Sequence, residues 1–137
     1  MDFWGAIKSG FINYVTFSGR ATRSEYWYWT LFIVLGTFAM AILDAAMFSN
    51  WPAISPLESV FSLLTILPSL AVWVRRLHDL DASGWWVLVW FIPLFGWIAL
   101  IAVFCTRGTT GDNRFGPDRL KEISLRLEAR ARVRRGA

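Results

Sequence analysis

The chain has 137 residues, enough for one domain, and it is 55% hydrophobic and 17% aromatic with only 18% charged residues. This composition is too apolar for a soluble fold of that size, and the apolar residues gather into about three blocks near the ~20 residues that a helix needs to cross a bilayer. The net charge of +4 arises late in the chain, because nine of the fourteen cations follow residue 106. A basic segment beside lipid favours anionic headgroups over nucleic acid as its partner.

The single cysteine, Cys105, excludes an internal disulfide and cannot form a zinc site alone. We therefore expect no metal and no cofactor. The sequence predicts an all-α integral membrane protein with an interfacial helix at its start, about three transmembrane helices and a basic amphipathic helix at its end.

Residues 3–17 predict an amphipathic helix that lies in the membrane interface. Phe3, Ile7 and Phe11 recur at steps of four, while Lys8 lies on another face. The segment lacks the compact apolar core and the small-residue cleavage site of a signal peptide, so we expect it to be retained.

The first predicted span covers residues 26–47 and opens with an aromatic belt at 26–29. Thr22 and Glu25 precede it at the spacing of a capping box, which marks the start of a helix. Asp44 lies about 18 residues into the span, or roughly 27 Å along it, near the far interface. We expect an interfacial acid there rather than a proton or ion ligand.

The second predicted span covers residues 57–74, after a short turn at 48–56 that contains two prolines. Pro68 lies inside this span. Because proline has no N–H, we expect a kink and a freed carbonyl one turn earlier. A carbonyl that binds something is the less favoured alternative.

The third apolar block, residues 85–105, has Pro93 and Gly96 at its centre and creates a conflict of topology. Three straight spans put the basic tail opposite the second loop, whereas basic segments tend to stay in the cytoplasm. Either the block is one kinked span, or Pro93 to Gly96 turn a re-entrant hairpin that brings both ends back. The sequence favours the kinked span, because each hairpin arm would be only about 12 Å long and its turn would need cover.

Residues 107–117 are rich in glycine and predict an ordered, turning loop. Residues 119–137 predict a basic helix with Leu120, Ile123 and Leu127 on one face. We expect this helix to lie on anionic lipid, with binding to a protein partner as the alternative. Two acid–base pairs stand four residues apart in the favourable order, Glu122 with Arg126 and Glu128 with Arg132.

The two later apolar blocks meet at residues 75–84, which we call the polar junction. The simpler interpretation is an interfacial anchor: the arginines reach lipid phosphates, Arg75 pairs with Asp79, Arg76 points elsewhere, and Ser83 caps the next helix. The sharper hypothesis is a binding site for an anionic headgroup or small ligand, since guanidinium groups suit phosphate. The candidate residues of this site are Arg20, Arg23, Arg75, Arg76, His78, Asp79 and Asn113.

Two further functions are weaker alternatives. A membrane enzyme could use His78 and Asp79 as a general base with Ser83 or Cys105 as nucleophile, but neither nucleophile stands in a known motif. An oligomeric transporter would need Asp44 or Glu58 to face inward. We expect no enzyme and no nucleic acid partner, and we leave open a homo-oligomer or a membrane-protein partner.

Three motifs together carry a resemblance, residues 17–27, residues 75–86 and residues 111–117 (GDNRFGP). With these the chain resembles the domain of unknown function 805 family (DUF805), small bacterial inner-membrane proteins that include the YhaH-like proteins. The resemblance covers about residues 3–118. It implies a multi-pass inner-membrane protein and brings no catalytic residues. We therefore divide the chain into a membrane domain at 1–118 and a basic tail at 119–137.

Overall fold

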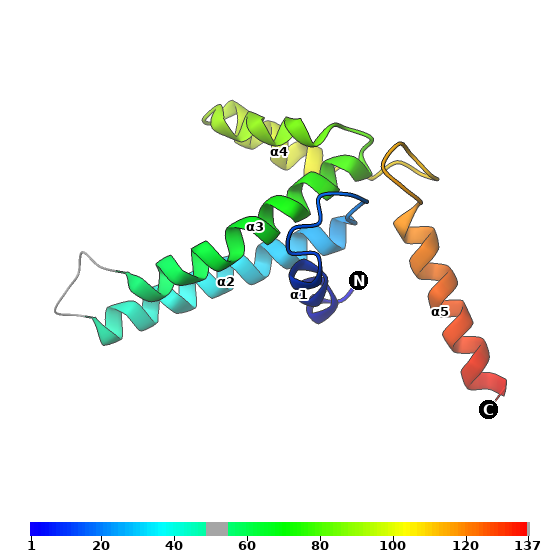
Figure 1. The fold of residues 1–137 in the computed structure, drawn as a ribbon, viewed down its shortest axis with the longest axis horizontal. Coiled ribbons are helices and arrows are strands. Elements are labelled where there is room, and N and C mark those ends of the chain that lie inside the picture. Colours follow the sequence, from blue (N-terminus) through cyan, green and yellow to red (C-terminus); the bar gives the residue numbers. More distant parts are fainter. Residues whose placement is uncertain (49–54, 137) are drawn as a thin grey trace. The chain divides into compact units, whose positions relative to one another are not determined.

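The computed structural model describes residues 1–48 and 55–136, and the helices account for most of this part of the chain. The predicted turn at 48–56 falls largely on residues 49–54, outside the described residues. The all-α prediction is confirmed. The helices are α1 (Phe3–Ile12), α2 (Arg23–Met47), α3 (Pro56–Asp79), the 3₁₀ helix η1 (Gly84–Phe91), α4 (Phe95–Cys105) and α5 (Arg119–Gly136) (Figure 1).

α1 is shorter than the predicted helix at 3–17. Asp2 begins it by accepting a hydrogen bond from the Gly5 N–H at 3.1 Å. Asn13 ends it, because its side-chain amide donates to the Ser9 carbonyl at 2.9 Å and its backbone leaves the helical region. The interfacial position of α1 stays a prediction.

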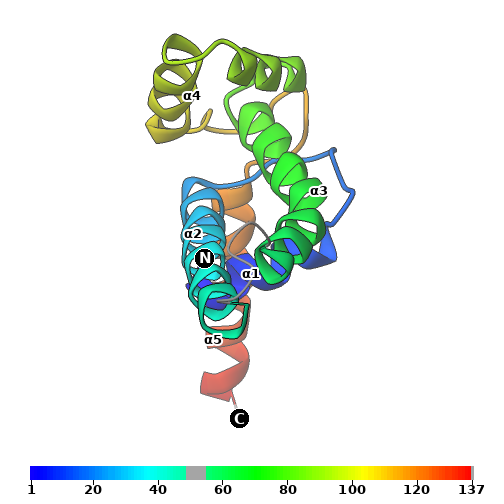
Figure 2. The ribbon, with the colours of Figure 1, turned by 90° about the vertical axis from the view of Figure 1, so that its left-hand side faces the viewer.

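The chain forms two compact units, and the first contains residues 1–17 and 24–72. Here α2 and α3 lie side by side, as both views show (Figures 1 and 2). Each is long and apolar enough to cross a bilayer, with 25 and 24 residues, and only 6% and 22% of their apolar stretches are buried. Apolar side chains that are left unburied along much of a helix fit lipid as their surroundings.

Asp44 joins the end of α2 to the start of α3. Its carboxylate accepts hydrogen bonds from the N–H groups of Leu57 and Glu58 at 3.0 and 2.9 Å, and only 4% of the residue is exposed. The first N–H groups of a helix lack partners within the helix, so an acid from the neighbouring helix supplies the cap. Asp44 is therefore a capping residue between helices, which the sequence alone did not indicate.

α3 continues through Pro68, which removes the hydrogen bond that the Leu64 carbonyl would accept. The Tyr14 hydroxyl donates to this carbonyl at 2.7 Å. A freed carbonyl in an apolar segment costs free energy unless another donor reaches it. The freed carbonyl is thus bound by a side chain of the same protein, and the kink at Pro68 stays a prediction.

The second unit contains residues 18–23 and 73–137. In it, residues 85–105 form two helices that pack side by side, η1 and α4, joined at residues 92–94. The Trp73 ring lies 5.0 Å from Trp90 and 6.4 Å from Phe104, centroid to centroid. One straight helix would separate positions 90 and 104 by about 21 Å. The prediction of a single kinked helix is wrong, and the hairpin is observed (Figure 2).

Local backbone chemistry explains the reversal. Pro93 cannot continue the hydrogen bonding of η1, and Leu94 adopts a positive φ of 64°. Gly96 then lets the arms touch, because a Cβ there would lie 1.9 Å from the Val89 carbonyl oxygen. Ser83 caps η1, as predicted, by accepting from the Trp85 N–H.

Candidate functional site

The polar junction is mostly helical. α3 runs to Asp79, five residues beyond the predicted end of the second span, so the junction begins in the last turn of a helix. Its charged side chains are also buried: the exposed fraction is 3% for Arg75, 0% for Arg76 and 6% for Asp79. Buried arginines need close partners, because moving a charge out of water is costly.

Asp79 is the centre of the site and pairs with two arginines. One carboxylate oxygen accepts from Arg20 Nε at 2.9 Å, and the other accepts from Arg76 Nη1. We call Arg20, Arg76 and Asp79 the arginine–aspartate cluster. The expectation that Arg76 points elsewhere is wrong, because residues three apart on a helix also share a face. Arg20, 59 residues away in the chain, was not predicted to reach Asp79.

Other N–H groups of the two arginines donate to backbone carbonyls. Arg20 donates to the carbonyls of Thr109 and Gly111 at 2.5 and 2.6 Å. Arg76 donates to the carbonyls of Phe104 and Thr106 at 3.2 and 2.5 Å. Charge-assisted hydrogen bonds of this kind are the strong ones in proteins. The cluster thus ties residues 18–23, the end of α3 and the loop after α4 together.

Gly108 allows the loop to pass directly over the cluster. A Cβ at this position would lie 2.0 Å from an Asp79 carboxylate oxygen. Only glycine leaves room for that approach.

His78 and Asn113 support the cluster from outside. The Asn113 side-chain amide donates to the His78 carbonyl at 2.8 Å and to the Thr109 hydroxyl at 2.9 Å. The His78 ring stacks on Phe115 at 3.9 Å with parallel planes, and its Nδ1 lies 3.2 Å from the Gly19 carbonyl oxygen. His78 and Asn113 therefore lie together, joined through the His78 carbonyl, and their predicted contact with a ligand stays a prediction.

Arg23 and Arg75 complete the candidate set. Arg23 is exposed and donates to the Cys105 carbonyl at 3.4 Å, at the end of α4. Arg75 is buried, and its carbonyl accepts from the Ala21 N–H at 2.9 Å. The structure brings all seven candidate residues into one unit. Five of them are tied to other parts of the chain by side-chain contacts that point inward, and Arg23 keeps an exposed guanidinium.

The arrangement does not orient a catalytic pair. The His78 ring contacts Gly19 and Phe115, whereas the Asp79 oxygens face Arg20 and Arg76. A general base needs its partner within hydrogen-bond reach. Within residues 1–48 and 55–136, no group of three or more His, Cys, Asp or Glu side chains is placed to hold a metal ion.

Sequence reasoning missed several residues of this site. Thr109 and Gly108 face the cluster, Phe115 stacks on His78, and Arg114 pairs with Asp81 at 3.1 Å on the exposed side. All but Asp81 belong to the loop at 106–118. Its glycines signalled an ordered loop but could not show what the loop covers.

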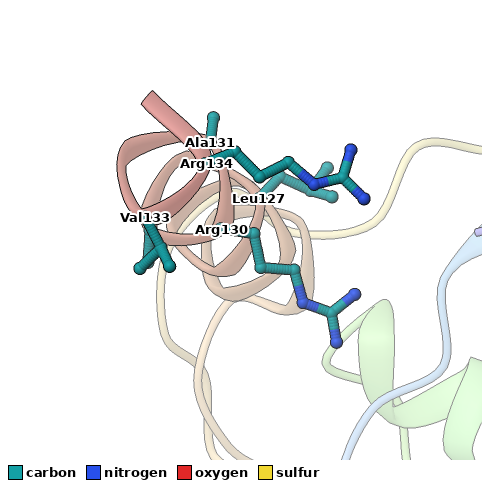
Figure 3. Close-up of a pocket in the computed structure, with 6 residues that line it drawn as sticks. Leu127, Arg130, Ala131, Val133 and Arg134 are labelled. Carbon is teal, nitrogen blue, oxygen red and sulfur yellow. The ribbon is translucent and has the colours of Figure 1, made fainter. Parts of the chain in front are cut away.

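α5 carries most of the exposed positive charge. It contains seven cations and two acids, and Glu122 pairs with Arg126 at 2.6 Å as predicted. Figure 3 shows Arg130 and Arg134, one turn apart, projecting to the same side of the helix, with Val133 on another. The hollow drawn there is lined by α5 residues alone, so it is an open helix surface.

Comparison with known proteins shows to which family the chain belongs. The chain matches the family described as protein of unknown function, DUF805, over residues 14–117. The chain belongs to the DUF805 family. This DUF805 protein is 44% identical over 109 residues to inner membrane protein YhaH of Escherichia coli strain K12, covering 77% of this chain and 88% of that protein. It is 45% identical over 106 residues to inner membrane protein YhaI of the same strain, covering 77% and 87%.

A more distant relative is uncharacterized protein YiiR of the same strain, 28% identical over 129 residues, covering 75% of this chain and 85% of that protein. No solved structure matches the chain. The two long apolar helices and the two inner-membrane relatives agree, and this DUF805 protein is a bacterial inner membrane protein. The family match ends at residue 117, just before α5 begins at Arg119.

Proposed function

We propose that this DUF805 protein is a membrane interaction module that binds anionic phospholipid through α5 and the exposed Arg23. The observation that carries the proposal is the exposed α5 with seven cations against two acids. Each cation near an anionic bilayer contributes about 1 kcal/mol of attraction. Leu120 and Leu127 lie on one face and are 56% and 59% exposed, which supplies apolar contact with the acyl region.

In this proposal the arginine–aspartate cluster is a platform and the lipid-binding groups lie outside it. Arg20 and Arg76 direct their N–H groups to Asp79 and to four backbone carbonyls. They therefore hold the chain at the headgroup level rather than contact a headgroup. Arg23 remains exposed at the end of α4, where a helix C-terminus favours a cation and a phosphate can reach it.

The test measures whether α5 contacts the bilayer in the full-length protein. An environment-sensitive fluorophore is attached to Ser124→Cys, on the face of Leu120, in a Cys105→Ser background and in nanodiscs. We expect a blue-shifted emission in discs that contain phosphatidylglycerol, reversed by salt, and no such shift in phosphatidylcholine discs.

A charge variant makes the test specific. Replacing Arg130 and Arg134 with glutamine removes two cations, about 2 kcal/mol, and should shift the docking equilibrium about 30-fold toward the undocked state. The matched control replaces both with lysine, keeps the charge and should dock normally. Equal emission in both kinds of disc, or docking unaffected by the glutamine variant, would remove lipid as the target of α5 and leave a protein partner.

A further inference from the structure

We propose that η1 and α4 form a re-entrant hairpin that enters one leaflet of the bilayer, with its apolar sides covered by the acyl chains of that leaflet. This inference concerns the hairpin alone and does not depend on lipid binding by α5.

The two ends of the hairpin are held at one place. Asp79 lies before the hairpin and Thr109 after it, yet the Thr109 N–H donates to the Asp79 carbonyl at 2.8 Å. Arg76, also before it, donates to the carbonyls of Phe104 and Thr106 at its far end. A segment that crosses a hydrocarbon core of about 30 Å cannot have bonded ends. Both ends therefore lie on the same side of the membrane.

The length of the arms matches half a bilayer. η1 has eight residues and α4 has eleven. At about 2.0 and 1.5 Å per residue these arms reach roughly 16 Å each, close to half of a 30 Å hydrocarbon core.

The surface of the hairpin fits hydrocarbon as its occupant. From Ala82 to Thr106 no side chain is charged, whereas Asp81 and Arg107 flank this stretch. Large apolar side chains on both arms face outward, with 79% of Phe91 and 78% of Phe95 exposed. An exposed apolar surface of this extent is unfavourable in water and favourable in lipid. The indoles at 85–86, also exposed, begin the hairpin at the depth where tryptophan gathers at interfaces.

Four backbone donors at the turn of the hairpin are bonded locally, which lowers the free-energy cost of placing the turn among acyl chains. Ile92, Phe95, Gly96 and Ile98 donate their N–H groups to carbonyls within residues 89–94, at 2.8 to 3.0 Å. Pro93 has no N–H to satisfy. Each donor that is bonded locally spares the turn the penalty of an orphaned polar group among acyl chains.

The hairpin also resolves the conflict of charge. With two spans, the cations before residue 24, those of the polar junction and those of the tail all fall on one side. The tendency of basic segments to stay in the cytoplasm then assigns the hairpin to the cytoplasmic leaflet.

Sided labelling of the full-length protein tests this. In a Cys105→Ser background, single cysteines replace Ala82 before the hairpin, Thr110 after it, and Ala53 between α2 and α3 as the matched control. A membrane-impermeant maleimide is applied to right-side-out and inverted vesicles. We expect Ala82→Cys and Thr110→Cys to react from the cytoplasmic side and Ala53→Cys from the opposite side. Reaction of the first two from opposite sides overturns the hairpin topology.

Two further measurements test the topology and the depth of the hairpin without sided labelling. Reporter domains inserted after Ala53 and fused after Ala137 should report opposite sides, and reports from one side contradict the proposal. A fluorophore on Leu94→Cys should be quenched most by nitroxides deep in the acyl chains. Strongest quenching by a headgroup nitroxide would place the hairpin on the membrane surface and refute insertion.

Discussion

Replacing Asp79 with asparagine is the most direct test of the arginine–aspartate cluster. The change keeps the shape of the side chain and removes the charge that faces Arg20 and Arg76, whose side chains are 1% and 0% exposed. Removing one partner of a buried ion pair costs about 3–5 kcal/mol, because the remaining charge stays buried without compensation. Here two cations lose the same carboxylate. We therefore expect a loss of at least about 3 kcal/mol in the free energy of unfolding.

The assay is equilibrium unfolding of the full-length protein in mixed micelles, followed by tryptophan fluorescence. Asp81→Asn is the matched control, because Asp81 lies two residues away and pairs with Arg114 at 3.1 Å with side chains 40% and 67% exposed. An exposed pair contributes only about 0–1 kcal/mol. If the Asp79 variant lost no more stability than the Asp81 variant, the cluster would not hold the fold. Gly108→Ala, which places a methyl group against Asp79, should also destabilise.

Two other predictions concern single hydrogen bonds. Tyr14→Phe should lower the free energy of unfolding by about 1 kcal/mol, because it leaves the Leu64 carbonyl unpaired. In a Pro68→Ala background the loss should be much smaller, since the alanine N–H can reach that carbonyl. Equal losses in the two backgrounds, measured in the same unfolding assay, would refute this coupling. The Gly111 N–H holds the pKa of the Asp118 carboxyl below its usual value of 3.8. The ionised Asp118 carboxyl therefore contributes its full stabilisation above pH 3.8, and this stabilisation is lost as the pH falls through the lowered pKa. We expect the first turn of α5 to lose amide protection on acidification, as measured by NMR. The Asp118→Asn variant, which does not titrate, should show no such step.

The all-α class and the two spans could be predicted from the sequence because they depend on local composition. An apolar stretch near 20 residues needs no knowledge of its neighbours to be recognised. The extent of α3 was underestimated, since a run of charged residues normally ends a membrane helix. Arg76 and Asp79 instead continue the helix, because each finds a partner across the unit.

The contacts of the site depend on segments far apart in the chain. Arg20 and Asp79 are 59 residues apart, and Arg20 and Gly111 are 91 apart. No periodicity reports a pairing of that kind. The seven candidate residues were chosen for their chemistry, and the structure brings them together, but only coordinates show that Arg20 and Arg76 face inward.

The hairpin at 85–105 shows why composition alone misleads. Twenty-one apolar residues have the length of a span whether they run straight or double back. The deciding features are a positive φ at Leu94 and the close approach of Gly96 to the Val89 carbonyl, and composition reports neither backbone angles nor contacts. The excess of cations on both sides of the block agrees with the proposed hairpin topology, because it counts against a third crossing.

In a helical hairpin the connection usually both joins the two helices and fixes their register. Here Asp44, as a capping residue, fixes the register instead. The carboxylate bonds directly to the first N–H groups of α3, so the register of α2 and α3 is fixed by a side chain within the helices. This makes the α2–α3 connection a suitable place to insert an affinity tag or to exchange sequence between relatives, provided that the acid at position 44 is kept.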